Sequence, residues 1–151
     1  MNCPYCQSDQ VFVTNSRPTK NHTQIWRRRR CLSCRATFTT HEIIDLSHLI
    51  VIKKSGRKEK FNRAKLFSGI YGAAVGFKGP DKEKFVESVT NSLETEILAL
   101  KKKEILSSEI ADLVLQKLLT ANTGTFLRFI AYCKNITTLK QAKTELARYL
   151  K

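Results

Sequence analysis

Residues 24–40 read QIWRRRRCLSCRATFTT, in which four consecutive arginines lead directly into a pair of cysteines separated by two residues. A second such pair, CPYC, occupies residues 3–6. Each pair presents two thiolates from one tight turn, and four thiolates complete the closed tetrahedral shell that a structural zinc ion prefers. The spacing therefore predicts a zinc site that holds the fold together, with the ligands Cys3, Cys6, Cys31 and Cys34.

Two other interpretations of the cysteine pairs are chemically possible. In a reducing compartment, paired cysteines of this kind are typical of metal ligands rather than of disulfides. An iron site with the same four sulfurs is the minority alternative, whereas a thioredoxin-like redox pair uses a single CxxC beside a strand–helix unit. The fifth cysteine, Cys133, stands in the apolar segment FIAYCKNI and is read as a small buried hydrophobic residue.

The arginine block is the second feature of this region. If residues 24–30 form a strand, successive arginines face opposite sides of it. The first 48 residues contain three acidic residues, too few to neutralise these arginines, so the block predicts a surface that binds phosphate. A solvated charged face is the alternative, and Trp26 either stacks on a base or packs in the core. The candidate DNA-binding residues are Arg17, Arg27, Arg28, Arg29 and Arg30.

Composition agrees with a polyanionic partner. The 151 residues carry 27 Lys+Arg against 13 Asp+Glu, a net charge of +14, which favours nucleic acid, nucleotide phosphates or an anionic membrane surface. The chain opens MNCPYC, without the features of a secretory signal, and it contains no apolar stretch long enough to cross a bilayer. We therefore expect a cytoplasmic protein that is not bound to a membrane.

The sequence pattern predicts an α+β protein. Residues 1–48 contain short strand-like runs with too few apolar residues for an unaided core, as in a small zinc ribbon with an antiparallel sheet. From residue 49 an apolar run and a hairpin signal precede segments with helical periodicity, which predict four or five helices. Asn62 and Thr138 are expected to cap two of them, Thr138 in a capping box with Gln141. We expect domains at 1–48 and 49–139, followed by a C-terminal helix at 140–151.

The hairpin segment is strongly basic. Ser55-Gly56 suits a two-residue turn because glycine tolerates a positive φ. Several cations crowd this turn and the helix after it, and a nucleotide triphosphate would relieve that crowding; without further information, a solvated basic hairpin is the better interpretation. Glu59 would then bind a ribose hydroxyl or a metal-bound water, or pair with a lysine. The cations are Lys53, Lys54, Arg57, Lys58, Lys60 and Lys65.

Together these motifs resemble a known family. CPYC, then RRRRCLSC followed by FTTHE, is similar to the zinc-ribbon head of the NrdR family, bacterial transcriptional repressors of ribonucleotide reductase genes. Residues 50–66, IVIKKSGRKEKFNRAKL, are similar to the opening of the ATP-cone, a mainly helical nucleotide-sensing domain that begins with a hairpin. The resemblance implies a homo-oligomer that binds duplex promoter DNA, holds Zn²⁺, and senses ATP or dATP, with or without Mg²⁺.

The resemblance also implies roles for particular residues. It places nucleotide contacts at Val51, Lys53, Lys54, Arg57, Glu59, Phe61 and Lys65. In the later segment TFLRFIAYCKN, Arg128 and Phe129 match the family, whereas Phe126 and Cys133 stand where its members commonly have tyrosines. Such a protein would be bacterial, cytoplasmic and associated with the nucleoid when bound to DNA.

Two other function classes remain as alternatives. An RNA-binding zinc ribbon of the translation machinery would share the basic ribbon, but it gives no reason for the hairpin VIKKSGRKEKF. A nucleotide-hydrolysing enzyme would need catalytic motifs, and the sequence contains no GxxxxGK[ST] loop, nucleophile elbow or HExxH. We therefore expect a regulator that is not an enzyme.

Overall fold

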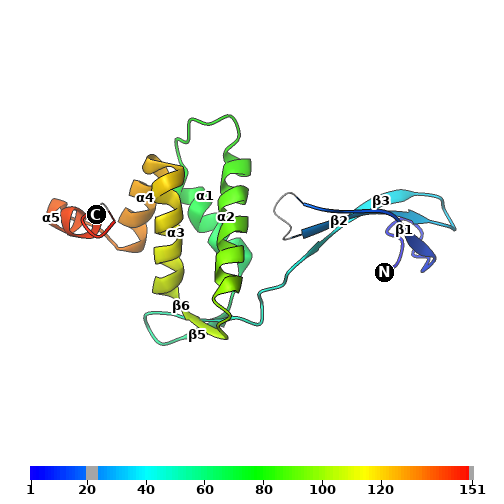
Figure 1. Ribbon diagram of the computed structural model, residues 1–151, viewed down its shortest axis with the longest axis horizontal. Coiled ribbons are helices and arrows are strands. Elements are labelled where there is room, and N and C mark those ends of the chain that lie inside the picture. Colours follow the sequence, from blue (N-terminus) through cyan, green and yellow to red (C-terminus); the bar gives the residue numbers. More distant parts are fainter. Residues whose placement is uncertain (20–23, 150–151) are drawn as a thin grey trace. The chain divides into compact units, whose positions relative to one another are not determined.

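The computed structural model describes residues 1–19 and 24–149 (Figure 1). Their contacts divide the chain into two compact units, Met1–Asp45 and Leu46–Lys151. The first unit is a three-stranded sheet and the second is mainly helical, so the predicted α+β class is confirmed. The predicted domain boundaries at residues 48 and 139 stay a prediction.

The first unit, here called the ribbon, contains one antiparallel sheet with the strand order β1-β2-β3. On the described residues, β1 pairs with β2 in two registers, because a β-bulge at Thr14 interrupts the ladder between Val13 and Asn15. A bulge inserts one extra residue on one strand and so changes which residues share a face beyond it. The strands are β1 (Val11–Pro18), β2 (Gln24–Cys31) and β3 (Thr37–Ile43).

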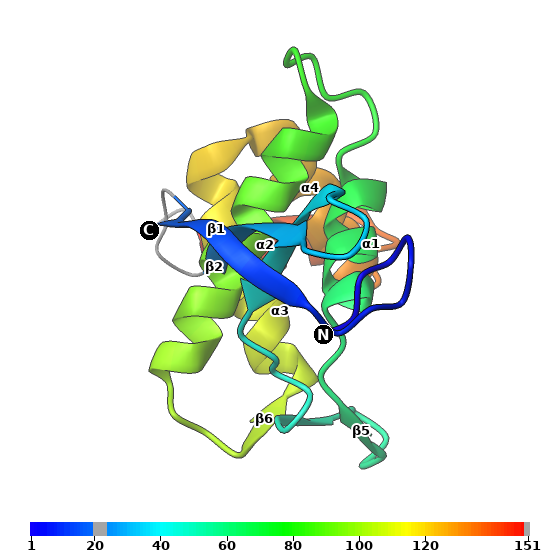
Figure 2. The same cartoon turned by 90° about the vertical axis from the view of Figure 1, so that its right-hand side faces the viewer.

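The second unit, here called the cone, begins with a small sheet of order β5-β4-β6. The predicted hairpin forms the antiparallel pair β4–β5, and β6 adds a parallel strand on the other side of β4. Figure 2 shows β5 and β6 together at one end of the helical layer. The sequence analysis did not predict β6, because a three-residue strand between two helices has no periodicity of its own. These strands are β4 (Ile50–Ile52), β5 (Lys58–Lys60) and β6 (Glu104–Leu106).

The hairpin turn differs from the two-residue turn that we expected. The N–H of Gly56 donates to the carbonyl of Lys53 at 2.9 Å, and the N–H of Lys53 donates to the carbonyl of Arg57 at 2.9 Å. This pattern encloses three residues, 54–56, and it ends on Gly56 with φ of 80°. A turn followed by one left-handed residue is the usual form of a three-residue hairpin loop, and it needs glycine at that last position.

Five helices are described in the cone, and all but α3 begin after a residue whose side chain caps the helix. Asn62 accepts from the N–H of Lys65 at 3.2 Å, and Thr138 forms the predicted capping box with Gln141. Asn122 ends α3 and also caps α4, since its side chain accepts from the N–H of Thr125 at 2.8 Å. The helices are α1 (Arg63–Ala73), α2 (Lys82–Ala99), α3 (Ser107–Ala121), α4 (Thr123–Cys133) and α5 (Leu139–Leu146).

The cone has two groups of buried apolar side chains. The larger group lies among α1, α2, α3 and α4 and includes the fully buried Ile70, Leu93 and Phe126. The smaller group joins the sheet to the helices and includes Val51, Phe61, Ile97 and Ile105. This second group positions the hairpin against α1. None of the described helices combines the length and the apolar character that a membrane span requires.

Candidate functional site

The two cysteine knuckles of the ribbon have the same backbone plan. The residue four positions after the first cysteine of each knuckle has a positive φ of 61°: Gln7 follows Cys3, and Arg35 follows Cys31. The N–H of Cys3 donates to the carbonyl of Ser8 at 2.8 Å, and the N–H of Cys31 donates to the carbonyl of Ala36 at 3.0 Å. These short-range bonds turn each pair of sulfurs toward the other pair.

The sulfur atoms of the four cysteines lie close together in one cluster. The Sγ atoms of Cys3 and Cys34 are 3.6 Å apart, as are those of Cys6 and Cys31, and all four lie within 4.8 Å of one another. A tetrahedral zinc ion with bonds of about 2.3 Å requires sulfur–sulfur distances of about 3.8 Å. The sulfurs therefore fit a closed tetrahedral zinc site, and none of them forms a disulfide.

The pKa values of two of these thiols are shifted in opposite directions. The backbone N–H of Cys34 is the main reason that the pKa of Cys31 is lowered to about 6. The backbone N–H of Ala36 favours the thiolate of Cys34, but loss of solvent and the neighbouring sulfurs outweigh it and raise the pKa of Cys34 to about 12. Four adjacent thiolates repel one another, and a divalent metal ion removes that repulsion.

The arginines of β2 differ in their surroundings. Arg27 and Arg29 are half-buried, whereas Arg28 and Arg30 are exposed, as the predicted alternation along a strand requires. The Nη2 atom of Arg27 lies 3.0 Å from Oε2 of Glu42, and Nε of Arg29 donates to Oγ1 of Thr40 at 2.9 Å. Two of the four arginines are therefore held by side chains of β3.

The cone contains a cavity of about 700 Å³ beside the hairpin. Five of the seven predicted nucleotide-contact residues line it: Val51, Lys53, Glu59, Phe61 and Lys65. The other two do not, because Lys54 is an exposed residue of the turn and Arg57 follows the turn. Helices α3 and α4 form the opposite wall with Ser107, Ile110, Ala111, Val114, Arg128, Phe129 and Tyr132.

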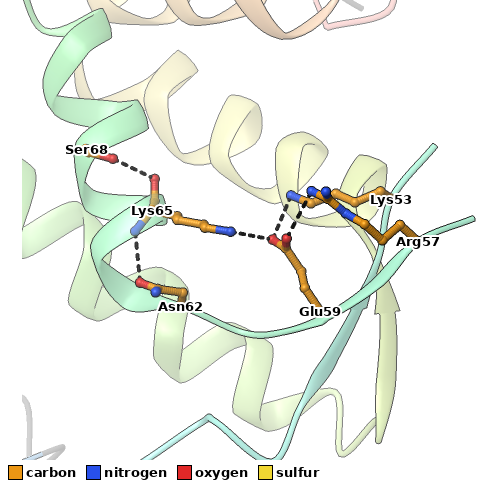
Figure 3. A network of polar contacts seen from close by, with 6 residues as sticks. All are labelled: Lys53, Arg57, Glu59, Asn62, Lys65 and Ser68. Carbon is orange, nitrogen blue, oxygen red and sulfur yellow. Dashed lines mark hydrogen bonds and ion pairs between the residues drawn. The ribbon is translucent and has the colours of Figure 1, made fainter. Parts of the chain in front are cut away.

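One carboxylate organises the charged side of this cavity (Figure 3). Oε1 of Glu59 lies 3.0 Å from the ammonium of Lys53 and 3.0 Å from that of Lys65, and Oε2 lies 3.5 Å from Arg57. Hydrogen bonds from Lys53 and then Lys65 lower the pKa of Glu59, so that it is a carboxylate at neutral pH. The cations converge there from the hairpin and from α1, which makes a cradle for a polyanion.

Two residues of α4, Phe126 and Cys133, stand where members of the resembled family commonly have tyrosines, and the structure shows what surrounds them. Phe126 is 1% exposed and packs in the core, in edge contact with Tyr149, and it does not line the cavity. Cys133 is half-buried against the same core, so it is less buried than its apolar context predicted. Tyr132 lines the cavity and is 81% exposed, so it supplies an aromatic ring at the mouth.

Several lining residues were not among the predicted contacts. Gly69 and Gly72 lie on the face of α1 that lines the cavity, where a larger side chain would reduce its volume. The guanidinium of Arg128 passes close to Gly76 and Gly124, and an ideal Cβ at these glycines would lie 3.3 and 3.4 Å from its nitrogens. The only sequence signal for Arg128 was the family resemblance, because nothing local relates it to the hairpin.

Comparisons with known proteins agree with this arrangement. The family model described as "Transcriptional repressor NrdR-like, N-terminal domain" matches residues 1–42, and the model "ATP cone domain" matches residues 49–138. Three similar proteins are each named "Transcriptional repressor NrdR". The one from Thermoanaerobacter sp. (strain X514) is 34% identical over 151 residues, which are 100% of this chain and 94% of that protein. The one from Petrotoga mobilis is 37% identical over 139 residues (92% and 91%), and the one from Roseiflexus castenholzii is 35% identical over 149 residues (97% and 97%).

Proposed function

The chain belongs to the NrdR family of transcriptional repressors, and from this premise we propose that it represses ribonucleotide reductase genes in response to ATP and dATP. Membership makes it a zinc-dependent, nucleotide-responsive repressor and not an enzyme. Its ribbon carries the four-cysteine cluster, and its cone carries the cavity beside the basic hairpin, which we propose as the nucleotide site. We propose that it acts in the bacterial cytoplasm and, when it is bound to DNA, at the nucleoid, because a repressor must reach the chromosome.

The single observation that carries the choice of effector is the cationic cradle on the cavity wall. Lys53 and Lys65 point their ammonium groups at one position beside Glu59, next to a cavity large enough for a nucleotide. The lysines would bind the phosphates, Val51 and Phe61 would contact apolar parts of the nucleotide, and Arg128 would approach from α4. Lys54 and Arg57, at the turn, would reach the outer phosphates, with or without Mg²⁺.

The ribbon supplies the proposed DNA contacts. Cys3, Cys6, Cys31 and Cys34 would bind one zinc ion, which closes the two knuckles and holds β2 in register. Arginines from the set Arg17 and 27–30 would then contact duplex DNA, since arginine binds phosphate and the guanine edge through its planar fork. Several ribbons aligned on one duplex bind far more tightly than one, so we propose that the bound nucleotide sets the homo-oligomer and thereby DNA affinity.

Two measurements test this function. The first is native mass measurement of the full chain with no nucleotide, with ATP and with dATP, in which we expect at least two different masses. The second is binding to a duplex from upstream of a ribonucleotide reductase gene under the same three conditions, with ATP turnover followed in parallel. Retained zinc with no bound nucleotide and no shift of the duplex would refute the proposal, and turnover well above background would indicate an enzyme.

A further inference from the structure

The bulge at Thr14 determines which face of the ribbon carries Arg17. Before the bulge Val13 pairs with Arg29, and after it Asn15 pairs with Arg28 and Arg17 pairs with Trp26. Without the extra residue, Arg17 would shift by one position and lie on the opposite face, because side chains alternate along a strand. The hydroxyl of Thr14 donates to the backbone carbonyl of Arg28 at 3.0 Å and holds this register.

The register collects three arginines on one face of the sheet. Directly paired residues on antiparallel strands lie on the same face, so Arg17, Arg28 and Arg30 share it with Trp26. Arg28 pairs with Thr39 and Arg30 pairs with Thr37 on β3. All three arginines and both threonines are exposed. We call this set, Arg17, Arg28, Arg30, Thr37 and Thr39, the open face.

No carboxylate of the described strands lies on the open face. Glu42 pairs with Ile25 and so belongs to the opposite face, where it binds Arg27. Within residues 1–19 and 24–149, the side-chain bonds of the arginine block are those of Arg27 and Arg29, and none involves the side chains of Arg28 or Arg30. Three fixed positive charges thus share one face of the sheet, two on β2 and one on β1, and they repel one another until an external anion approaches.

The arginines of the opposite face already have side-chain partners. Arg27 is paired with Glu42, Arg29 is bonded to Thr40, and both arginines are half-buried. The Nε atom of Arg27 is buried without a hydrogen-bond partner, so its guanidinium is packed into the sheet surface. To bind a phosphate, Arg27 would have to give up its carboxylate partner, whereas Arg28 would give up only water.

We infer that the open face is the surface that contacts duplex DNA, and that Arg27 and Arg29 act instead as braces between β2 and β3. This inference rests on the proposed function and divides the four-arginine block by role. Arg17, Arg28 and Arg30 contact phosphates or guanine edges, and the hydroxyls of Thr37 and Thr39 donate to neighbouring phosphates. The threonines are DNA contacts that neither the arginine block nor the family resemblance indicated.

Four single variants of equal charge change separate the two roles. Arg28→Gln and Arg30→Gln alter the open face, and Arg27→Gln and Arg29→Gln are the matched controls on the same strand. The full-length, zinc-loaded chain is titrated, with ATP present, against a duplex from upstream of a ribonucleotide reductase gene over a range of salt concentrations. Zinc content and thermal unfolding of every variant establish that the ribbon is folded.

We expect Arg28→Gln and Arg30→Gln each to lower the affinity for the duplex about tenfold. The slope of log affinity against log salt concentration should become less steep by about 0.9, which corresponds to the loss of one phosphate contact. For Arg27→Gln and Arg29→Gln we expect less than half that change in slope, together with a lower melting temperature. Thr39→Val, which keeps the shape and removes the donor, should weaken binding without changing the slope.

Equal changes in slope for all four arginine variants, or larger changes for Arg27→Gln and Arg29→Gln, would overturn the division while leaving the proposed function in place. A wild-type chain that binds no duplex would refute the proposed function itself. A structured RNA of equal length is the second probe. If RNA bound more tightly than the duplex, with the same loss on Arg28→Gln, the partner of the open face would be RNA and the inference would fail.

Discussion

The carboxylate of Glu59 lies 3.0 Å from the ammonium of Lys65, and this ion pair joins β5 to the first turn of α1. The same carboxylate oxygen lies 3.0 Å from Lys53, at the end of β4. Glu59 therefore keeps two cations side by side that would otherwise repel each other. It holds the charged wall of the cavity in place before any ligand arrives (Figure 3).

Removing Lys65 or Lys53 tests whether this wall binds the nucleotide. Lys65→Gln and Lys53→Gln should each weaken ATP and dATP binding about tenfold or more, because a hydrogen bond to a charged group contributes about 1.5–3 kcal/mol. Isothermal titration calorimetry measures the effect. Lys60→Gln is the matched control, since Lys60 is an exposed lysine of the same hairpin that does not line the cavity. An equal loss with Lys60→Gln would mean that only the overall charge matters.

The lowered pKa of Glu59 predicts a pH dependence of stability. A carboxyl whose pKa is lowered on folding stabilises the native state fully above its ordinary pKa, here 4.5, and loses this contribution as the pH falls through the lowered value. Melting temperature should therefore fall less steeply below this pH in Glu59→Gln than in the wild type. Glu83→Gln, at an exposed position of α2, is the control and should follow the wild-type curve.

The zinc site predicts independent behaviour of the two units. Cys34→Ser should release the zinc, unfold the ribbon and abolish DNA binding, because binding of a structural zinc ion supplies the folding free energy of so small a module. Nucleotide binding and the helical circular dichroism of the cone should remain. Cys133→Ser is the control and should keep its zinc, since Cys133 is half-buried against the core of the cone and is not one of the four clustered cysteines. A zinc-loaded Cys34→Ser protein would exclude the four-cysteine site.

Two glycine-to-alanine changes should shift stability in opposite directions. Gly72 lies within α1, and an added Cβ there would meet no atom within 4 Å, so Gly72→Ala should stabilise the cone by about 0.8–1 kcal/mol. Gly56 has a φ of 80°, where alanine is strained, so Gly56→Ala should destabilise it by about 1–2 kcal/mol. Urea unfolding gives both values. A destabilised Gly72→Ala protein would show that the space along α1 is smaller than described.

A hydroxyl group bonds the C-terminal segment to α3, in addition to its apolar contacts with the core. Tyr149 donates to Oδ1 of Asp112 at 2.8 Å, an atom that also lies 2.8 Å from the ammonium of Lys134. Tyr149→Phe should lower the free energy of unfolding by about 1 kcal/mol and speed amide exchange in α5. Tyr132→Phe is the control, because its ring is largely exposed and no side chain in the described part of the cone bonds its hydroxyl. Unchanged exchange in α5 would show that apolar packing alone holds it.

Features that depend only on residues close together in the chain could be predicted from the sequence. The two CxxC pairs predicted the metal cluster, because ligand spacing within a knuckle is a local property of the backbone. The side chains of Asn62 and Thr138 cap helices as predicted, since a cap involves residues only three positions apart. The hairpin between 50 and 60 also followed from local pattern, although its loop has three residues and not two.

Other features have no local signature. Strand β6 exists because Ile105 packs against Val51 and the backbone of Ile50 bonds to the carbonyl of Lys103, across more than fifty residues of chain. The cavity likewise combines a hairpin near residue 55 with the wall formed by Arg128, Phe129 and Tyr132 on α4. Such contacts depend on how elements pack, and neither periodicity nor capping chemistry encodes which elements meet.

The sequence by itself determined that this chain carries a four-cysteine ribbon, a basic hairpin and a block of four arginines, because residue type and spacing set ligand chemistry and charge. Only the tertiary structure decided what each arginine faces. One bulged residue, Thr14, sets the register that puts Arg17 on the same face of the sheet as Arg28 and Arg30, while Glu42 and Thr40 hold the other two arginines. The physical reason is that a single-residue shift in strand pairing moves a side chain to the opposite face of the sheet.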